Sequence, residues 1–230
     1  MDPLIQLRGV TKRYDDMTQP ALDAIDLDIE AGRITAIMGP SGGGKSTLLN
    51  LVGGLDRPTR GEIVVDGVRV DRLSETAAAR FRRAKVGFVF QFFHLLEDLS
   101  VADNVAVAAL LAGTSRAETR DRVGELLSQL GLGDKARQFP TTLSGGERQR
   151  LAIARAIVNA PAVLLADEPT GALDRRNGES ALALLEDLNR RGQTILLVTH
   201  DEGLAQRRAH RIVHLVDGAI AGDVSARMVA

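Results

Sequence analysis

A nine-residue glycine-rich stretch limits the fold of this chain more than any other part of its sequence. It lies between Ile34–Met38, an apolar run typical of a strand inside a parallel sheet, and Leu48–Val52, which begins a helix. The order matches G-x-x-x-x-G-K-[ST], in which glycines let several backbone N–H groups and a helix N-terminus face one phosphate group. The residues of this phosphate loop are Gly39, Pro40, Ser41, Gly42, Gly43, Gly44, Lys45, Ser46 and Thr47.

The phosphate loop predicts a site for a purine nucleoside triphosphate, without identifying the base. Lys45 would neutralise the β- and γ-phosphates, and the Ser46 hydroxyl is placed to ligate Mg²⁺. A flexible linker of glycine and serine is the alternative, but a linker needs neither the Lys-Ser pair nor a flanking strand and helix.

Two acidic residues follow another apolar run and extend this prediction. Asp167 and Glu168 come directly after Val163–Ala166. In an α/β sheet the carboxyl ends of parallel strands meet at one edge, so both acids are expected beside the phosphate loop. Asp167 would hold Mg²⁺, directly or through water, and Glu168 would polarise the attacking water. The alternative is that the two acids only begin a turn with Pro169.

The pattern of strands and helices predicts an α/β fold. Alternation of apolar residues with aspartate at 25–29 indicates a half-buried antiparallel strand, with Ile5–Tyr14 as its partner. Elsewhere buried strands alternate with amphipathic helices, which favours a mainly parallel sheet. Further strands are expected at Val86–Phe90 and Ile195–Val198, and helices from Ser115, within Thr141–Asn159 and at about Asp174–Arg190. Residues 1–230 are expected to form one domain, with a helical subdomain at about 92–160 and a frayed tail at 222–230.

Composition narrows the classes of partner. Lys and Arg number 29 and Asp and Glu 30, so no overall field attracts DNA, and no nucleic acid partner is expected. The absence of cysteine excludes disulfides, thiolate metal sites and thiol nucleophiles. The longest apolar run, Val105–Ala112, has eight residues, where a membrane helix needs about 20. Met1–Pro3 lacks the profile of a signal peptide, so a soluble, cytoplasmic chain is expected.

A second glycine-rich segment, Leu143-Ser144-Gly145-Gly146-Glu147, begins another predicted helix. Ser144 and Glu147 have the spacing of a capping box, which is a sufficient local explanation for both. Two consecutive glycines weaken a first helical turn, however, and bare backbone at a helix N-terminus suits a phosphate. A second phosphate cradle makes sense if it serves a nucleotide held by another copy of the chain.

Leu143–Glu147 resembles the signature sequence of ABC-type ATPases, and the other motifs of that family appear in its order. The phosphate loop resembles the family's Walker A motif, and Asp167-Glu168 resembles Walker B with its catalytic glutamate. The resemblance covers nearly the whole chain. It implies a phosphate-loop NTPase core with an N-terminal antiparallel β subdomain and a helical subdomain that bears the signature.

Four further positions resemble family motifs. Gln91 is similar to the Q-loop glutamine, which also ligates the metal, and Asp174 to the D-loop aspartate. His200 resembles the switch histidine near the γ-phosphate, and Tyr14 the aromatic residue that stacks on adenine. Each has a simpler alternative: an ordinary strand aromatic for Tyr14, a surface amide for Gln91, a helix start for Asp174. For His200 the alternative is a structural histidine beside a helix capped by Thr199 and Glu202.

Several segments resemble one branch of the family, the ATPases of lipoprotein-release, macrolide-export and cell-division systems. These are Val86–Leu96, Asn50–Asp56, Asp167–Gly171 and the loop residues Met17–Pro20. The chain departs from family patterns at Gly43, where Ser or Ala is common, at Gly171, where Ser or Asn is frequent, and at Glu97, where the branch often has Pro. None of these departures removes a reacting group.

The resemblance implies an ATPase that uses ATP and Mg²⁺ and pairs head-to-tail with a second copy around two nucleotides. Its expected partner is an integral membrane permease subunit, which would hold the chain peripherally on the inner face of the cell membrane. Residues Phe92–Val105, after Gln91, would convey motion to that permease. Rival hypotheses are a non-transport ABC ATPase, a regulatory nucleotide-binding module, and a phosphate-loop kinase or GTPase.

Overall fold

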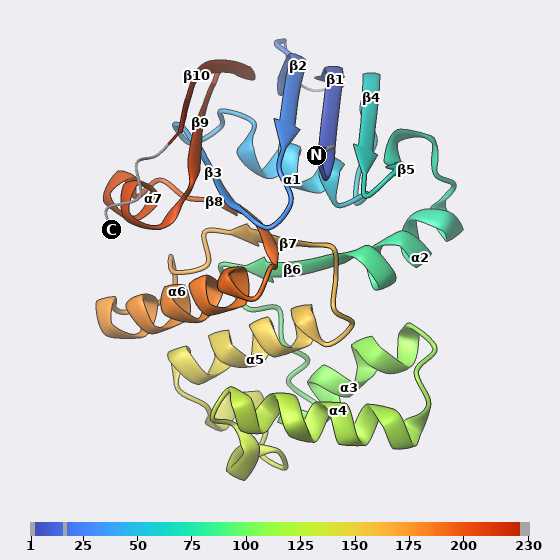
Figure 1. Cartoon of the computed structure of the whole chain (residues 1–230), viewed down its shortest axis with the longest axis vertical. Coiled ribbons are helices and arrows are strands. Elements are labelled where there is room, and N and C mark those ends of the chain that lie inside the picture. The colour runs from blue at the N-terminus through green and yellow to red at the C-terminus, as the bar shows by residue number, and fades with distance from the viewer. Residues whose placement is uncertain (1–2, 16–17, 226–230) are drawn as a thin grey trace. The chain divides into compact units, whose positions relative to one another are not determined.

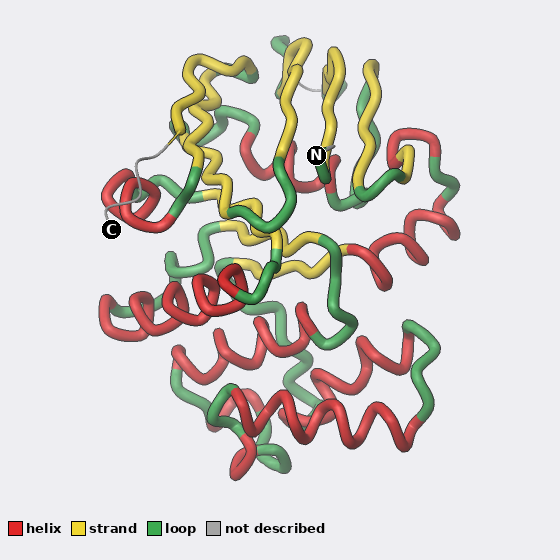
Figure 2. Tube along the Cα trace, viewed as in Figure 1, coloured by secondary structure: helices red, strands yellow, loops and turns green. Residues whose placement is uncertain are grey.

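Antiparallel strands open the chain. This computed structural model describes residues 3–15 and 18–225. Strand β1 (Ile5–Lys12) pairs with β2 (Leu22–Ile29) on one side and with β4 (Arg60–Val65) on the other. The two-residue β5 (Val68–Arg69) completes the sheet in the order β2-β1-β4-β5 (Figure 2). Ile25, Leu27 and Ile29 are buried and Asp26 is exposed, so the predicted alternation and pairing are confirmed.

The chain divides into two compact units. The first comprises residues 1–82 and 188–230, and the second comprises residues 83–187. The first contains the antiparallel sheet and a second set of strands, in the order β10 (Ala219–Ser225), β9, β3 and β8. Strand β3 (Ile34–Met38), buried throughout, runs parallel to both β8 (Thr194–Val198) and β9 (Arg211–Val216). The helices of this unit are α1 (Lys45–Val52), most of α2 (Glu75–Lys85) and α7 (Glu202–Arg208), with the 3₁₀ turn η1 (Val70–Arg72).

The second unit joins a parallel strand pair to a group of helices. Strand β6 (Val86–Phe90) pairs with β7 (Val163–Asp167). Helices α3 (Val101–Leu111), α4 (Arg116–Gln129) and α5 (Gly145–Ile157) lie side by side (Figure 1), and α6 (Arg175–Arg190) begins here. Two 3₁₀ turns, η2 (Gly133–Lys135) and η3 (Pro140–Thr142), link α4 to α5.

One apolar cluster packs α3, α4 and α5 together. It includes Val105, Val123, Leu127, Leu151 and Val158, each less than 5% exposed. Apolar residues recur at helical spacing along α4 and α5, which is why the sequence pattern located those two helices. Helix α3 was not predicted individually. Helix α4 begins as predicted, with the Ser115 side chain accepting a hydrogen bond from the Glu118 N–H. Ile157, the last residue of α5, is only partly buried.

The C-terminal prediction needs a correction. Residues Gly222–Ser225, expected to fray, belong to β10 (Ala219–Ser225) and pair with His214 to Arg211 of β9. Strand pairing satisfies their backbone groups, which composition alone does not reveal. The remainder of the expected tail, and Met17 of the loop before Pro20, lie outside the described residues. Within the described ranges, no helix is both long and apolar enough to cross a membrane.

Candidate nucleotide-binding site

The phosphate loop connects β3 to α1 in the first unit. Lys45, Ser46 and Thr47 form the first turn of α1, and Gly44 precedes them in a left-handed conformation with φ of +96°. No side chain caps this helix start. The first-turn N–H groups and the positive end of the helix are therefore left to an anion, as a phosphate site requires.

Close packing explains two of the loop glycines. A Cβ atom on Gly44 would lie 2.3 Å from the Ala21 carbonyl oxygen, in addition to the strain of its positive φ. A Cβ on Gly43 would lie 2.9 Å from the Leu215 carbonyl oxygen. Glycine at position 43, where the family pattern often has Ser or Ala, therefore avoids a close contact with the Leu215 carbonyl oxygen.

The Lys45 side chain folds over the loop. Its Nζ donates to the carbonyl oxygens of Gly39, at 2.9 Å, and Pro40, at 2.7 Å. The ammonium group is therefore held next to the curled backbone rather than extended into solvent. Ser46 is exposed beside it, with its hydroxyl on the first turn of α1.

Tyr14 shares one pocket with the phosphate loop. The pocket is lined by Tyr14, Ala21, Gly42, Gly44, Lys45, Ser46 and Thr47. The Tyr14 hydroxyl donates to Asp56 Oδ2 at 2.9 Å, and Lys12 Nζ lies 2.7 Å from Asp56 Oδ1 and 4.8 Å from the centre of the Tyr14 ring. Burial raises the pKa of Tyr14, so the phenol remains a donor. This arrangement fits a nucleotide whose base stacks on Tyr14 and whose phosphates enter the loop.

His200 emerges at the same edge of the first unit as the phosphate loop. Strands β3 and β8 are adjacent and parallel, and Ile37 of β3 lies opposite Val198 of β8. Gly39 comes two residues after Ile37, and His200 comes two residues after Val198, so both lie beyond the same ends of the two strands. His200 is exposed and precedes α7. Asp201 caps α7, since its Oδ1 accepts a hydrogen bond from the Leu204 N–H at 2.8 Å. The cap formed by Thr199 and Glu202, considered as the alternative, is therefore not the one present. Because α7 is capped without His200, capping does not account for this histidine.

The acidic residues and Gln91 come together at the end of the strand pair in the second unit. Phe90 lies opposite Asp167, so Gln91 and Glu168 follow side by side. Glu168 adopts φ of +47°, an uncommon conformation for a residue other than glycine. Backbone strain of this kind concentrates at functional sites.

Gly171 brings Gln91 against the turn that follows Glu168. The Gly171 N–H donates to the Glu168 carbonyl oxygen at 2.9 Å. A Cβ on Gly171 would lie 2.7 Å from Gln91 Nε2, so glycine at this position makes room for the amide side chain. The departure from the family pattern at Gly171 thus has a packing reason.

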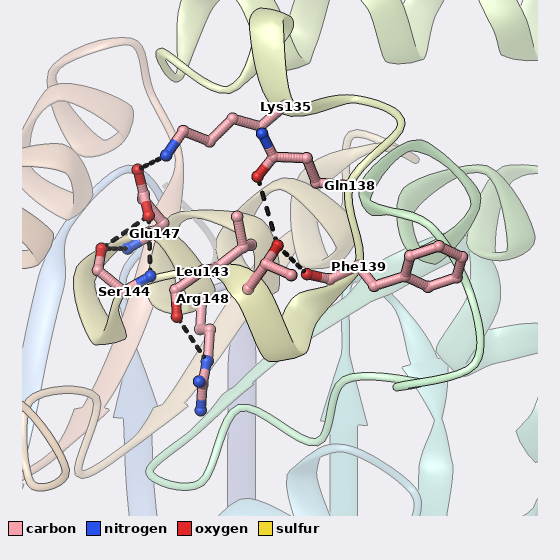
Figure 3. Close-up of polar contacts among 8 residues, drawn as sticks. Lys135, Gln138, Phe139, Leu143, Ser144, Glu147 and Arg148 are labelled. Carbon is pink, nitrogen blue, oxygen red and sulfur yellow. Dashed lines mark hydrogen bonds and ion pairs between the residues drawn. The ribbon is translucent and has the colours of Figure 1, made fainter.

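The signature segment forms the N-terminus of α5. Ser144 and Glu147 make a complete capping box, with the Ser144 N–H and hydroxyl both 2.8 Å from Glu147 Oε2 (Figure 3). Lys135 Nζ binds the other oxygen of the same carboxylate. The hydrogen bond from Lys135, followed by the backbone N–H of Ser144, lowers the pKa of Glu147 to about 2. The predicted capping box of α5 is therefore present, and the two residues inside it, Gly145 and Gly146, have no side chains.

Asp174 begins α6 and holds Asn177. Its two carboxylate oxygens accept from the Asn177 N–H at 2.9 Å and from Asn177 Nδ2 at 2.7 Å. These bonds from the Asn177 backbone and side chain lower the pKa of Asp174. A Cβ on Gly146 would lie 2.2 Å from Asn177 Oδ1, so the start of α6 packs directly on the bare backbone of the signature. Asp174 thus both begins a helix, as its simpler alternative states, and supports the signature.

The donor set fits the predicted metal. Ser46, Gln91 and Asp167 offer hydroxyl, amide and carboxylate oxygens, which are the ligands that Mg²⁺ prefers. Ser46 belongs to the first unit and the other two belong to the second.

Sequence reasoning missed the residues that hold the site residues in place. Tyr14 is held by Asp56, Glu147 is held by Lys135, and Gly146 is packed against Asn177. None of the three supporting residues has a sequence pattern around it that indicates its role. Asp56 lies 42 positions from Tyr14 in the chain, so only the paired strands of the first unit bring the two together.

Comparison with known proteins identifies the family. The family model described as ABC transporter matches residues 22–171. The macrolide export ATP-binding/permease protein MacB of Escherichia coli is 48% identical over 225 residues, which are 97% of this chain and 35% of that protein. The lipoprotein-releasing system ATP-binding protein LolD of Bacteroides thetaiotaomicron is 48% identical over 96% of this chain and 100% of its own length. The chain thus spans about a third of the macrolide-export relative and all of the lipoprotein-release relative.

Solved structures agree with the family model. A dimeric bacterial ABC transporter cassette superposes with a TM-score of 0.87 at 41% identity, over 97% of this chain and 99% of that one. A dimeric ATP-binding cassette in a post-hydrolysis state with ADP and Pi gives the same TM-score at 40% identity and the same coverage. The predicted family and its macrolide-export and lipoprotein-release branch are confirmed. The chain therefore belongs to the ABC transporter family of ATPases and has the fold of their ATP-binding cassettes.

Proposed function

We propose that the chain is the nucleotide-binding subunit of a membrane transport or release system, in which it binds Mg-ATP, pairs with a second copy and drives a permease. The observation that carries the proposal is the pocket shared by Tyr14 and the phosphate loop. It combines a stacking surface for a base with an uncapped helix start and a lysine for phosphates.

Hydrolysis would use the phosphate loop together with the residues that follow strands β6, β7 and β8. Lys45 would move from its loop carbonyls to the β- and γ-phosphates, while Ser46, Gln91 and Asp167 would hold Mg²⁺. The bound metal supplies positive charge that stabilises the phosphoryl oxygens. Glu168 would orient and polarise the attacking water, and His200 would contact the γ-phosphate. The strained φ of Glu168 supports this role.

A second copy would complete each nucleotide site. The backbone at Gly145, with the Ser144 hydroxyl, would face the nucleotide held by the phosphate loop of the other copy, while Gly146 packs against Asn177 behind it. The dimeric state of the related cassettes supports pairing with a second copy.

The permease partner would hold the chain at the cytoplasmic face of the membrane. Phe92 is 70% exposed and Leu96 46% exposed within the segment that follows Gln91, which suits contact with another protein. The names of the two relatives point to export of a small molecule or release of a lipoprotein. A purely regulatory module is disfavoured, since Glu168 and His200 both follow the expected strands. A non-transport ATPase is disfavoured because the similar relatives are named as ATP-binding proteins of export and release systems.

The variant Glu168→Gln tests the proposal. It keeps the size and shape of the side chain but replaces one accepting carboxylate oxygen with a donating NH2 group, so turnover should fall at least about a hundredfold while ATP binding remains. Light scattering with Mg-ATP should then show a trapped dimer. Glu125→Gln, an exposed substitution in α4, is the matched control and should behave as the parent. Parental turnover in Glu168→Gln would refute the role of Glu168, and failure of the parent to bind ATP would refute the proposal itself.

A further inference from the structure

The turn that follows Gln91 is strained. Phe93 and His94 adopt φ of +59° and +47°, two consecutive left-handed residues of which neither is glycine. The His94 N–H donates to the Phe92 carbonyl oxygen at 2.5 Å, which closes a tight turn around Phe93. Such backbone conformations are costly and persist only where surrounding contacts impose them.

One arginine of α5 holds this turn. Arg155 donates from Nη1 to the His94 carbonyl oxygen at 2.6 Å and from Nη2 to the Phe93 carbonyl oxygen at 2.9 Å. The left-handed conformation of both residues directs their successive carbonyls toward one guanidinium. A planar fork with paired N–H donors suits this arrangement, whereas a lysine ammonium is a single compact charge.

Contacts on either side fix the ends of the segment. The His94 ring lies 4.7 Å from the ring of Phe90, the last residue of β6. Downstream, buried Asn104 binds both the N–H and the carbonyl oxygen of Leu96, at 2.8 and 2.9 Å. The segment is thus anchored at both ends, and Arg155 is the contact that selects the conformation between them.

Helix α5 connects this contact to the signature. The same helix begins at Gly145 and carries Arg155 about three turns later. A change in the position of α5 would therefore reach the turn through the guanidinium, 61 positions away in sequence from His94. Gln91 precedes the turn directly, so its placement depends on the conformation that the guanidinium holds.

We propose that Arg155 is a positioning residue that holds the turn after Gln91 in its strained form and thereby links Gln91 to the helix that carries Ser144–Glu147. This inference rests on the proposed function for the role of Gln91, but the hold of Arg155 on the turn does not. The competing explanation is that Arg155 only attaches α5 to its surroundings and contributes general stability.

The test uses Arg155→Lys in the full chain, with a fluorescent reporter on the turn. The chain has no tryptophan, so Phe92→Trp places a single tryptophan at the exposed tip of the segment. Without nucleotide, Arg155→Lys should lower the fluorescence anisotropy of this tryptophan and increase its quenching by acrylamide. Arg120→Lys, an exposed substitution in α4, is the control and should change neither quantity.

The second readout is the Mg²⁺ requirement. Loss of the paired hydrogen bonds should raise the Mg²⁺ concentration for half-maximal ATPase activity by about tenfold, with the KM for ATP within about twofold of the parent. His94→Gly added to Arg155→Lys should recover part of this loss, because glycine adopts positive φ without a Cβ penalty. A purely structural role would lower activity without moving the Mg²⁺ requirement and without recovery.

The outcomes separate the inference from the proposed function. Unchanged anisotropy and quenching in Arg155→Lys would overturn the inference, whatever the ATPase activity. Changed fluorescence with an unchanged Mg²⁺ requirement would overturn the link to Gln91. A parent chain with no ATPase activity would count against the proposed function, while the fluorescence would still decide whether Arg155 holds the turn.

Discussion

Glu147 shows how one side chain can serve both local structure and a site. Its carboxylate closes the capping box of α5 and binds Lys135, so it remains charged at the very place where a nucleotide of another copy is proposed to approach. Lys135 offsets that negative charge. The sequence predicted the capping box from its spacing, but nothing in the spacing pointed to Lys135, which lies 12 positions earlier in a separate 3₁₀ turn.

The stabilising effect of Glu147 should depend on pH. The pKa of Glu147 is lowered from 4.5 to about 2 in the folded chain. The contribution of the Glu147 carboxylate to the free energy of unfolding is therefore complete above pH 4.5 and is lost as the pH falls through about 2. We therefore expect the difference in unfolding free energy between the parent and Glu147→Gln to shrink as the pH is lowered across this window. Urea unfolding followed by circular dichroism measures the difference.

Glu125→Gln provides the comparison for this experiment, since Glu125 is an exposed glutamate of α4 outside the capping box. The difference in the free energy of unfolding between Glu125→Gln and the parent should stay constant as the pH is lowered over the same range. A constant difference for Glu147→Gln from neutral to acidic pH would contradict the assignment of the capping box and Lys135 as the cause of the low pKa.

Among the elements, helices were more predictable than the segments between them. Helix α4 follows from its apolar repeat and its Ser115 cap, because both signals are local. The irregular segment before α3 had no such signal. Its conformation depends on Asn104, which is fully buried and binds Leu96, Leu99 and Ser100 through hydrogen bonds of 2.8 to 3.0 Å.

Loss of the Asn104 amide should destabilise the chain. Asn104→Leu keeps the approximate size of the side chain but leaves several backbone groups without their partner, at a cost of about 2–4 kcal/mol. Chemical unfolding measures this as a lower free energy of unfolding. Gln129→Leu, at the exposed end of α4, removes an amide of similar chemistry and should change the free energy by less than about 0.5 kcal/mol. Equal effects of the two variants would show that Asn104 does not organise the segment.

At the scale of the whole molecule, the proposed function requires two copies. Ser144→Arg would place a large cation in the bare helix start of the signature and should prevent the Mg-ATP-dependent dimer of the Glu168→Gln background. ATP binding by the monomer should persist, because the phosphate loop and Tyr14 lie in the other compact unit. Light scattering and nucleotide titration measure the two properties separately.

Ser115→Arg is a matched control for this substitution. Ser115 caps α4 through the same kind of hydrogen bond as Ser144, so its replacement also removes a serine cap, but outside the signature. It should leave the dimer intact. Loss of the dimer in both variants would attribute the effect to helix stability, and persistence of the dimer in Ser144→Arg would refute the proposed role of the signature.

The phosphate loop, the buried strands and the helix that begins at Ser144 could be predicted from the residue order alone, because each depends on residues that are neighbours in the chain. The residue order also placed the site residues at strand and helix ends. Three contacts became visible only in the folded chain: Asp56 binds Tyr14, Gly171 makes room for Gln91, and Arg155 binds the strained turn. These contacts join residues that are 42 to 80 positions apart in the chain. The contact of Arg155 also depends on the left-handed backbone of Phe93 and His94, which the local sequence does not favour. The three contacts exist because packed elements bring distant groups together and hold them there, and a one-dimensional pattern carries no record of that packing.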